Sequence, residues 1–240
     1  MEEIINKLLE EKFLTYKELS MIKIRESGES MASLSGYPGL RTQCIDRRMK
    51  VFTGEEIYVR REVAESILSA QSILEKLSPN CVLEVVYGYR HTSVQQESYE
   101  GVMTNLGFAR ADTDDIKEII HRFVAVPEVA GHPTGGAVDL RIAKTDGSLL
   151  DVGTEAHDFI EKSYALALSV DSKTWRNRQL LRACMMAAGF APYDGEWWHY
   201  SYGDREWAAY YNRPFAIYDQ IDFRVPDLNL YTHGPSLETG

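Results

Sequence analysis

Apolar residues recur at helical spacing in several parts of the chain. The clearest case lies between residues 58 and 77, where one face of a helix would carry Val63, Ile67, Leu68, Ile73, Leu74 and Leu77. Pro79 and Asn80 follow and predict the end of that helix. Similar spacing predicts helices over residues 1–20, 113–124, 155–168 and 174–188. The last of these has Asp171 or Ser172 as its N-cap and Gly189 at its end.

Three segments have the character of strands. CVLEVVYGY (81–89) is β-branched and aromatic, AVDLRIA (137–143) alternates apolar and polar positions, and EWWHYSY (196–202) is densely aromatic. Residues 29–42 are predicted to be a turn-rich loop, and the stretch from Arg224 a surface tail. Because strands and helices are interspersed without a regular βαβ rhythm, we expect an α+β fold with a largely antiparallel sheet flanked by helices.

Length and composition place limits on this picture. The 240 residues contain no linker, which predicts one domain over residues 1–240. The excess of 36 acidic over 26 basic side chains argues against nucleic acid or an anionic membrane as a partner. No apolar run is long enough to span a bilayer, the first residues lack the pattern of a secretory signal, and the three cysteines are widely separated. We therefore expect a cytoplasmic protein with reduced thiols, whose oligomeric state the sequence leaves unknown.

One candidate for chemistry is the stretch GHPTGG followed by the strand that bears Asp139. His132 precedes a tight turn, and Asp139 points away from the face that carries Val138, Leu140 and Ile142. The carboxylate can therefore approach the imidazole across the turn. The alternative is a loop histidine followed by an exposed aspartate.

A second candidate is EWWHYSY, which places Glu196 three residues before His199. Burying a carboxylate in such an aromatic run is costly without a partner, and a metal-bound water or a cation would supply one. The alternative is an aromatic core strand with Glu196 at its exposed edge. On a regular strand these two side chains point to opposite faces, so a shared site requires a bend or bulge.

Two imidazoles and one carboxylate form the ligand set of catalytic zinc, which keeps its fourth position open. A separate carboxylate can then act as general base and acid, a role that suits Glu196. Arg90 is the candidate for stabilising an oxyanion, although alone it would be taken for a surface arginine. The remaining histidines have ordinary interpretations on a helix, beside a strand or in the tail: His91, His121, His157 and His233.

Several spaced motifs together resemble the D-alanyl-D-alanine dipeptidase family of zinc peptidases, which are related to D,D-carboxypeptidases and share the hedgehog/D,D-peptidase-like fold. They are FTGEEIYVRREVAES (52–66), YGYRHTS (87–93), AGHPTGGAVD (130–139), NRQLLRACMMAAGF (177–190) and EWWH (196–199) with YSYGDREWAAYY after it. The resemblance covers about residues 50–215. Outside that region we expect an N-terminal helical extension over residues 1–45 and a C-terminal surface tail over about residues 224–240.

The resemblance implies a role for each matching residue. His132, Asp139 and His199 would hold one zinc ion per chain, with Glu196 as general base and acid and Arg90 at the oxyanion. The family's G-T-x-x-D element, here GTEAHD (153–158), would make Asp158 the partner of the substrate's ammonium group. Alone, Asp158 would be a solvated residue on the first turn of a helix.

Two residues depart from the family pattern. Ala130 replaces a serine that helps to recognise the substrate's N-terminus, and His157 replaces a residue that is commonly aromatic. The implied substrate is D-Ala-D-Ala or a closely related short peptide of D-amino acids. The alternatives are a D,D-carboxypeptidase or cell-wall peptidase acting on longer peptides, and a zinc-binding module without catalysis.

Overall fold

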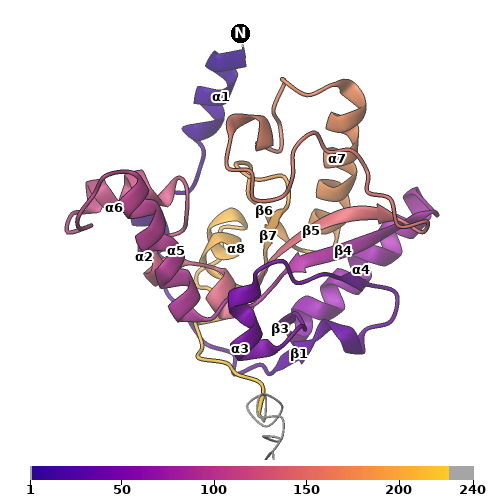
Figure 1. Cartoon of the computed structure of the whole chain (residues 1–240), viewed down its shortest axis with the longest axis horizontal. Coiled ribbons are helices and arrows are strands. Elements are labelled where there is room, and N and C mark those ends of the chain that lie inside the picture. The colour runs from indigo at the N-terminus through magenta and orange to yellow at the C-terminus, as the bar shows by residue number, and fades with distance from the viewer. Residues whose placement is uncertain (1, 227–240) are drawn as a thin grey trace, which may run out of the picture.

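The centre of the molecule is a five-stranded sheet (Figure 1), seen in a computed structural model that describes residues 2–226. In chain order its strands are β2 (Arg41–Thr42), β4 (Cys81–Tyr87), β5 (Ala137–Lys144), β6 (Ala191–Pro192) and β7 (His199–Ser201). Their spatial order is β2-β4-β5-β7-β6, with β2 parallel to β4 and the other pairs antiparallel. The predicted α+β fold with a largely antiparallel sheet is confirmed.

Two long helices pack together and build the main core with the sheet. They are α4 (Arg61–Leu77) and α7 (Ser172–Ala187). Of the predicted apolar stripe of α4, Val63, Ile67 and Leu74 are buried, whereas Leu77 at the end of the helix is exposed. The buried residues pack in one cluster with inward residues of β4 and β5 such as Val85 and Leu140. Burying a side chain of this size contributes roughly 1.5–3 kcal/mol, so this cluster gives the two central strands a rigid support.

A second group of helices lies on the other side of the molecule (Figure 1). It comprises α2 (Tyr16–Met21), α5 (Thr92–Asn105) and α6 (Asp114–His121), which pack around a smaller cluster that includes Leu19, Tyr99 and Ile120. The remaining elements are α1 (Glu2–Glu10), α3 (Lys50–Thr53), α8 (Arg205–Tyr210) and a two-stranded antiparallel sheet of β1 (Met31–Ser33) and β3 (Tyr58–Arg60). None of the helices within residues 2–226 is long and apolar enough to cross a membrane.

The predicted helix over residues 1–20 is wrong as a single element. It divides into α1 and α2, because Thr15 caps a new helix there. The Thr15 side chain accepts from the Glu18 backbone N–H, and the Glu18 carboxylate accepts from the Thr15 backbone N–H, which is a reciprocal capping box.

The predicted helix over 155–168 is also wrong. His157 has a φ of 70°, which a right-handed helix does not allow, and only a short 3₁₀ turn forms, at Glu161–Ser163. Residues 29–42 contain β1 and β2 rather than loop alone. The sequence patterns did not predict α5 or α8. Most of the predicted C-terminal tail, with His233, lies outside the described residues.

Candidate metal centre

Two neighbouring strands bring Asp139 and His199 together. In the antiparallel pair of β5 and β7, these two residues stand directly opposite each other. Directly opposed side chains share one face of the sheet and lie close together. His132 reaches the same place from the 3₁₀ turn His132–Thr134, which ends at Gly135 with a φ of 74°, in the left-handed region that glycine adopts readily.

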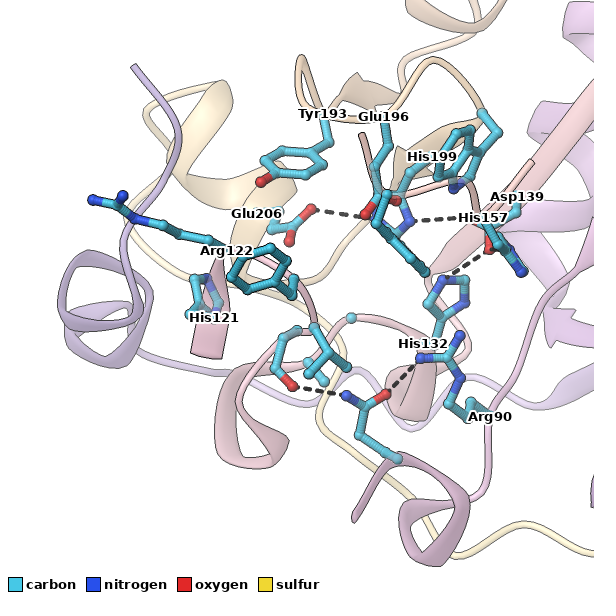
Figure 2. Close-up of a pocket in the computed structure, with 18 of the residues that line it drawn as sticks. Arg90, His121, Arg122, His132, Asp139, His157, Tyr193, Glu196, His199 and Glu206 are labelled. Carbon is cyan, nitrogen blue, oxygen red and sulfur yellow. Dashed lines mark hydrogen bonds and ion pairs between the residues drawn. The ribbon is translucent and has the colours of Figure 1, made fainter. Parts of the chain in front are cut away.

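The three side chains fit a divalent metal ion (Figure 2). His132 Nε2 lies 3.4 Å from Asp139 Oδ2, and His199 Nδ1 lies 3.0 Å from Asp139 Oδ1. One ligand atom from each residue lies within 4.8 Å of the others. Ligands of a tetrahedral zinc ion are separated by about 3.3 Å, so small adjustments would place all three around one ion.

The backbone supports this arrangement at His132. Its Nδ1 lies 2.8 Å from the carbonyl oxygen of Gly88. Because a carbonyl oxygen can only accept, Nδ1 carries the proton and Nε2 keeps the lone pair that a metal needs.

In the metal-free protein, burial and charge give His132 and Asp139 the protonation states that metals bind. Burial lowers the pKa of His132 to about 4, so its imidazole is neutral at pH 7. Burial disfavours the Asp139 carboxylate, but the neighbouring histidines, His132 first, outweigh it and hold the pKa of Asp139 well below its usual range. Around His199, hydrogen bonds to Asp139 and Glu206 outweigh burial and raise the pKa of that imidazole, so the surroundings favour a positive charge there. The centre therefore favours a cation.

Glu196 lies beside these ligands because it is in a turn. Its backbone N–H donates to the Tyr193 carbonyl (3.2 Å), and the His199 N–H donates to the Glu196 carbonyl (3.3 Å). On a regular strand, Glu196 and His199 would point to opposite faces. Because the chain bends before β7, the two side chains can share one site. Glu196 and the three metal-ligand candidates line one pocket. Burial raises the pKa of Glu196 to about 7, within the range of an effective general base.

Arg90 lines the same pocket (Figure 2), and two hydrogen bonds hold it in place. Its Nη1 donates to Gln95 Oε1 (2.8 Å), and its Nε donates to the Tyr87 hydroxyl (3.2 Å). Gln95 is buried and donates in turn to the Ala125 carbonyl (2.8 Å). The guanidinium is therefore a fixed donor that faces the pocket, which a surface arginine would not be.

Asp158 has a different position. Its side chain is exposed, accepts from the Glu155 backbone N–H (3.1 Å) and does not line the pocket. The adjacent His157 does line it, and its Nε2 lies 2.8 Å from Asp139 Oδ2. The sequence patterns did not assign His157 to the site, although its departure from the family pattern was a signal. The ammonium-binding role of Asp158 stays a prediction.

Further residues complete the pocket wall, and Ala130 is one of them. The acidic Glu206 and the aromatic Tyr193 also line it, close to Glu196 (Figure 2). Nothing in the motif spacing pointed to Glu206, which follows β7 on α8. The pocket thus combines three residues that could hold a metal ion, a carboxylate of raised pKa and a fixed guanidinium.

Residues 24–221 match the D-ala-D-ala dipeptidase family. The chain belongs to this family of metallopeptidases. A curated relative, the D-alanyl-D-alanine dipeptidase of Synechocystis sp., is 28% identical over 230 residues, which cover 84% of this chain and 93% of that protein. The D-alanyl-D-alanine dipeptidase of Escherichia coli is 38% identical over 71 residues, 30% of this chain and 37% of that protein. Among solved structures, the LdcB LD-carboxypeptidase is a remote likeness with 18% identity and a TM-score of 0.46, over 77% of this chain and 72% of that one. The predicted family and the prediction of a metallopeptidase are confirmed.

Proposed function

We propose that this family member hydrolyses the peptide bond of D-Ala-D-Ala, or of a closely related short dipeptide, in the cytoplasm. The observation that carries the proposal is the convergence of His132, Asp139 and His199 in a pocket that also holds Glu196 and Arg90. The family membership supports the substrate class. One zinc ion per chain is the expected cofactor, because two imidazoles and one carboxylate suit catalytic zinc.

Zinc bound by these side chains would supply a Lewis acid and lower the pKa of a coordinated water towards neutrality. Glu196 would take a proton from the attacking water and return it to the leaving amine. Its raised pKa suits both halves of this transfer, because a base of pKa near 7 can hold and release a proton at neutral pH. Arg90 would donate to the oxygen that becomes negative, and its two hydrogen bonds hold it ready for that role.

The second half of the proposal concerns recognition of the substrate's N-terminus. We propose that Asp158 meets the free ammonium group, which requires segment 153–158 to turn towards the pocket that His157 already lines. The exposed position of Asp158 favours a second candidate, a carboxypeptidase acting on longer peptides, which would need no ammonium partner.

A turnover assay separates these candidates. Release of D-alanine is measured from D-Ala-D-Ala, from N-acetyl-D-Ala-D-Ala and from a longer peptide ending in D-Ala-D-Ala, with added zinc and with a chelator. L-Ala-L-Ala is the stereochemical control. We expect zinc-dependent cleavage of D-Ala-D-Ala and poor cleavage of the acetylated peptide. Comparable efficiency on both would refute the ammonium role of Asp158, and the absence of any turnover would refute the peptidase.

Glu196→Gln provides the matched catalytic control. Glutamine has nearly the shape of glutamate but cannot act as a base, so turnover should fall at least 100-fold while one zinc ion per chain is retained. Unchanged turnover would remove Glu196 from the mechanism. Zinc retention without turnover in the unaltered chain would favour the non-catalytic module.

A further inference from the structure

His199 has two ring nitrogens, and they face different partners. Nδ1 faces Asp139 in the proposed metal set, while Nε2 lies on the opposite side of the ring, 3.4 Å from Glu206 Oε2 and 3.4 Å from Ser201 Oγ. Ser201 Oγ also donates to Glu206 Oε2 at 3.1 Å. The imidazole therefore lies between the metal set and a carboxylate that none of the sequence motifs assigned.

The local fold holds Glu206 at this place. Directly after β7, Gly203 turns the chain with a φ of 75°, in space where a Cβ would overlap the Tyr218 ring. Asp204 then caps α8, its Oδ1 accepting from the Trp207 backbone N–H at 2.9 Å. Glu206 follows within the first turn of α8, and its side chain is only 17% exposed. A helix start fixed so close to β7 leaves the carboxylate little freedom to move away from His199.

The alternative tautomer of His199 shows why this contact matters. Asp139 Oδ1 lies 3.0 Å from Nδ1 and could accept a proton from it, which would remove the lone pair that a metal needs. A carboxylate at Nε2, directly and through the Ser201 hydroxyl, favours the proton on that side instead. An imidazole that donates its outer N–H to a carboxylate is held in orientation and becomes a more basic ligand.

We infer that Glu206 is a positioning residue of the metal centre, which keeps Nδ1 of His199 free and directed at the ion. The inference rests on the proposed function only through the metal set, and it adds a residue to that set's supporting contacts. Glu206 would act through His199 and need not touch the substrate.

Metal affinity tests the inference without any substrate. The zinc dissociation constant is measured by competition with a chromophoric chelator for the unaltered chain, Glu206→Gln, Glu206→Asp and Glu65→Gln. Glu65 is exposed on α4, so its change removes one charge away from the site. We expect Glu206→Gln to weaken zinc binding about 10–100-fold, Glu206→Asp to weaken it less because the charge remains, and Glu65→Gln to leave it unchanged.

Two further readouts separate positioning from a purely structural role. The visible absorption of the cobalt-substituted protein reports ligand geometry and should change in Glu206→Gln but not in Glu65→Gln. Ser201→Ala removes the hydroxyl contact and should weaken zinc binding by a smaller factor than Glu206→Gln. It also tests the contact if the glutamine variant does not fold.

Zinc affinity within twofold of the unaltered chain in folded Glu206→Gln, with an unchanged cobalt spectrum, would overturn the inference. If Glu206→Gln does not fold, unchanged affinity in Ser201→Ala would overturn it. The two proposals can fail separately. Weakened zinc binding in Glu206→Gln would support the positioning role even if the zinc-loaded unaltered chain cleaves no dipeptide. That second result would refute the peptidase alone. Normal zinc binding in an active Glu206→Gln variant would do the reverse.

Discussion

In the folded, metal-free protein, the surroundings of Glu196 disfavour the ionised form of its carboxyl group. Burial raises its pKa to about 7, against an ordinary value of 4.5. A carboxyl whose pKa is raised in the folded state binds more protons folded than unfolded, so the stability of the protein falls as pH rises from about 4.5 to about 7. Glu196→Gln removes this titration while nearly conserving shape. The variant should therefore be more stable than the unaltered chain, and increasingly so as pH rises.

The size of the effect follows from the two pKa values. One pKa unit corresponds to about 1.36 kcal/mol, so the difference between about 7 and 4.5 gives an upper bound of roughly 3 kcal/mol at pH 8, where both states are ionised. At pH 5 the folded carboxyl is already protonated and less than about 1 kcal/mol remains. Glu196 is only partly buried, and screening by water in the pocket reduces these figures. We expect the advantage of the glutamine variant to grow by about 1–2 kcal/mol between pH 5 and pH 8.

Urea unfolding of both metal-free proteins at pH 5, 6, 7 and 8 measures this directly. Comparison at each pH cancels the other titrating groups that the two chains share. Glu65→Gln serves as the control, because an exposed carboxyl should give no such pH-dependent gain. A stability difference between Glu196→Gln and the unaltered chain that stays constant with pH would refute the assignment of a raised pKa to Glu196.

Three substitutions test other parts of the account. In Gly131→Ala the new Cβ would overlap the buried Asp204 carboxylate, and we expect the free energy of unfolding to fall by about 1–3 kcal/mol. Gly101→Ala is the control, because its Cβ meets no atom and should not destabilise the protein. Equal effects of the two substitutions would contradict this prediction. Asp171→Ala removes the α7 cap and should cost about 1 kcal/mol in urea unfolding, and no loss would count against the cap. Arg90→Lys keeps the charge but loses the fixed geometry, so kcat should fall at least 10-fold with zinc affinity unchanged, and a normal kcat would exclude the oxyanion role.

The parts of the fold that sequence patterns predicted are those with dense apolar periodicity. One face of α4 and the inward positions of β4 and β5 are buried in the main core, so the apolar residues there had to follow the period of the element. By contrast, α5 buries Val94, Gln95 and Tyr99 among polar neighbours and shows no continuous apolar stripe. In segment 155–168, apolar residues at helical spacing were misleading, because the left-handed backbone at His157 excludes a helix.

The sequence motifs indicated which residues could hold a metal, but not how these residues lie relative to one another. The motifs named His132, Asp139 and His199, yet only the pairing of β5 with β7 places Asp139 opposite His199. Such a register depends on long-range packing, which local patterns do not contain. Glu206 could not be found from the sequence, since its place beside His199 results from the short turn between β7 and α8.

The most direct test of the metal centre is a crystal structure of the zinc-loaded protein, with anomalous data collected on both sides of the zinc absorption edge. We predict one zinc peak per chain, about 2.0–2.2 Å from His132 Nε2, His199 Nδ1 and an Asp139 oxygen. A zinc ion held through His199 Nε2, or bound away from Asp139, would contradict this prediction.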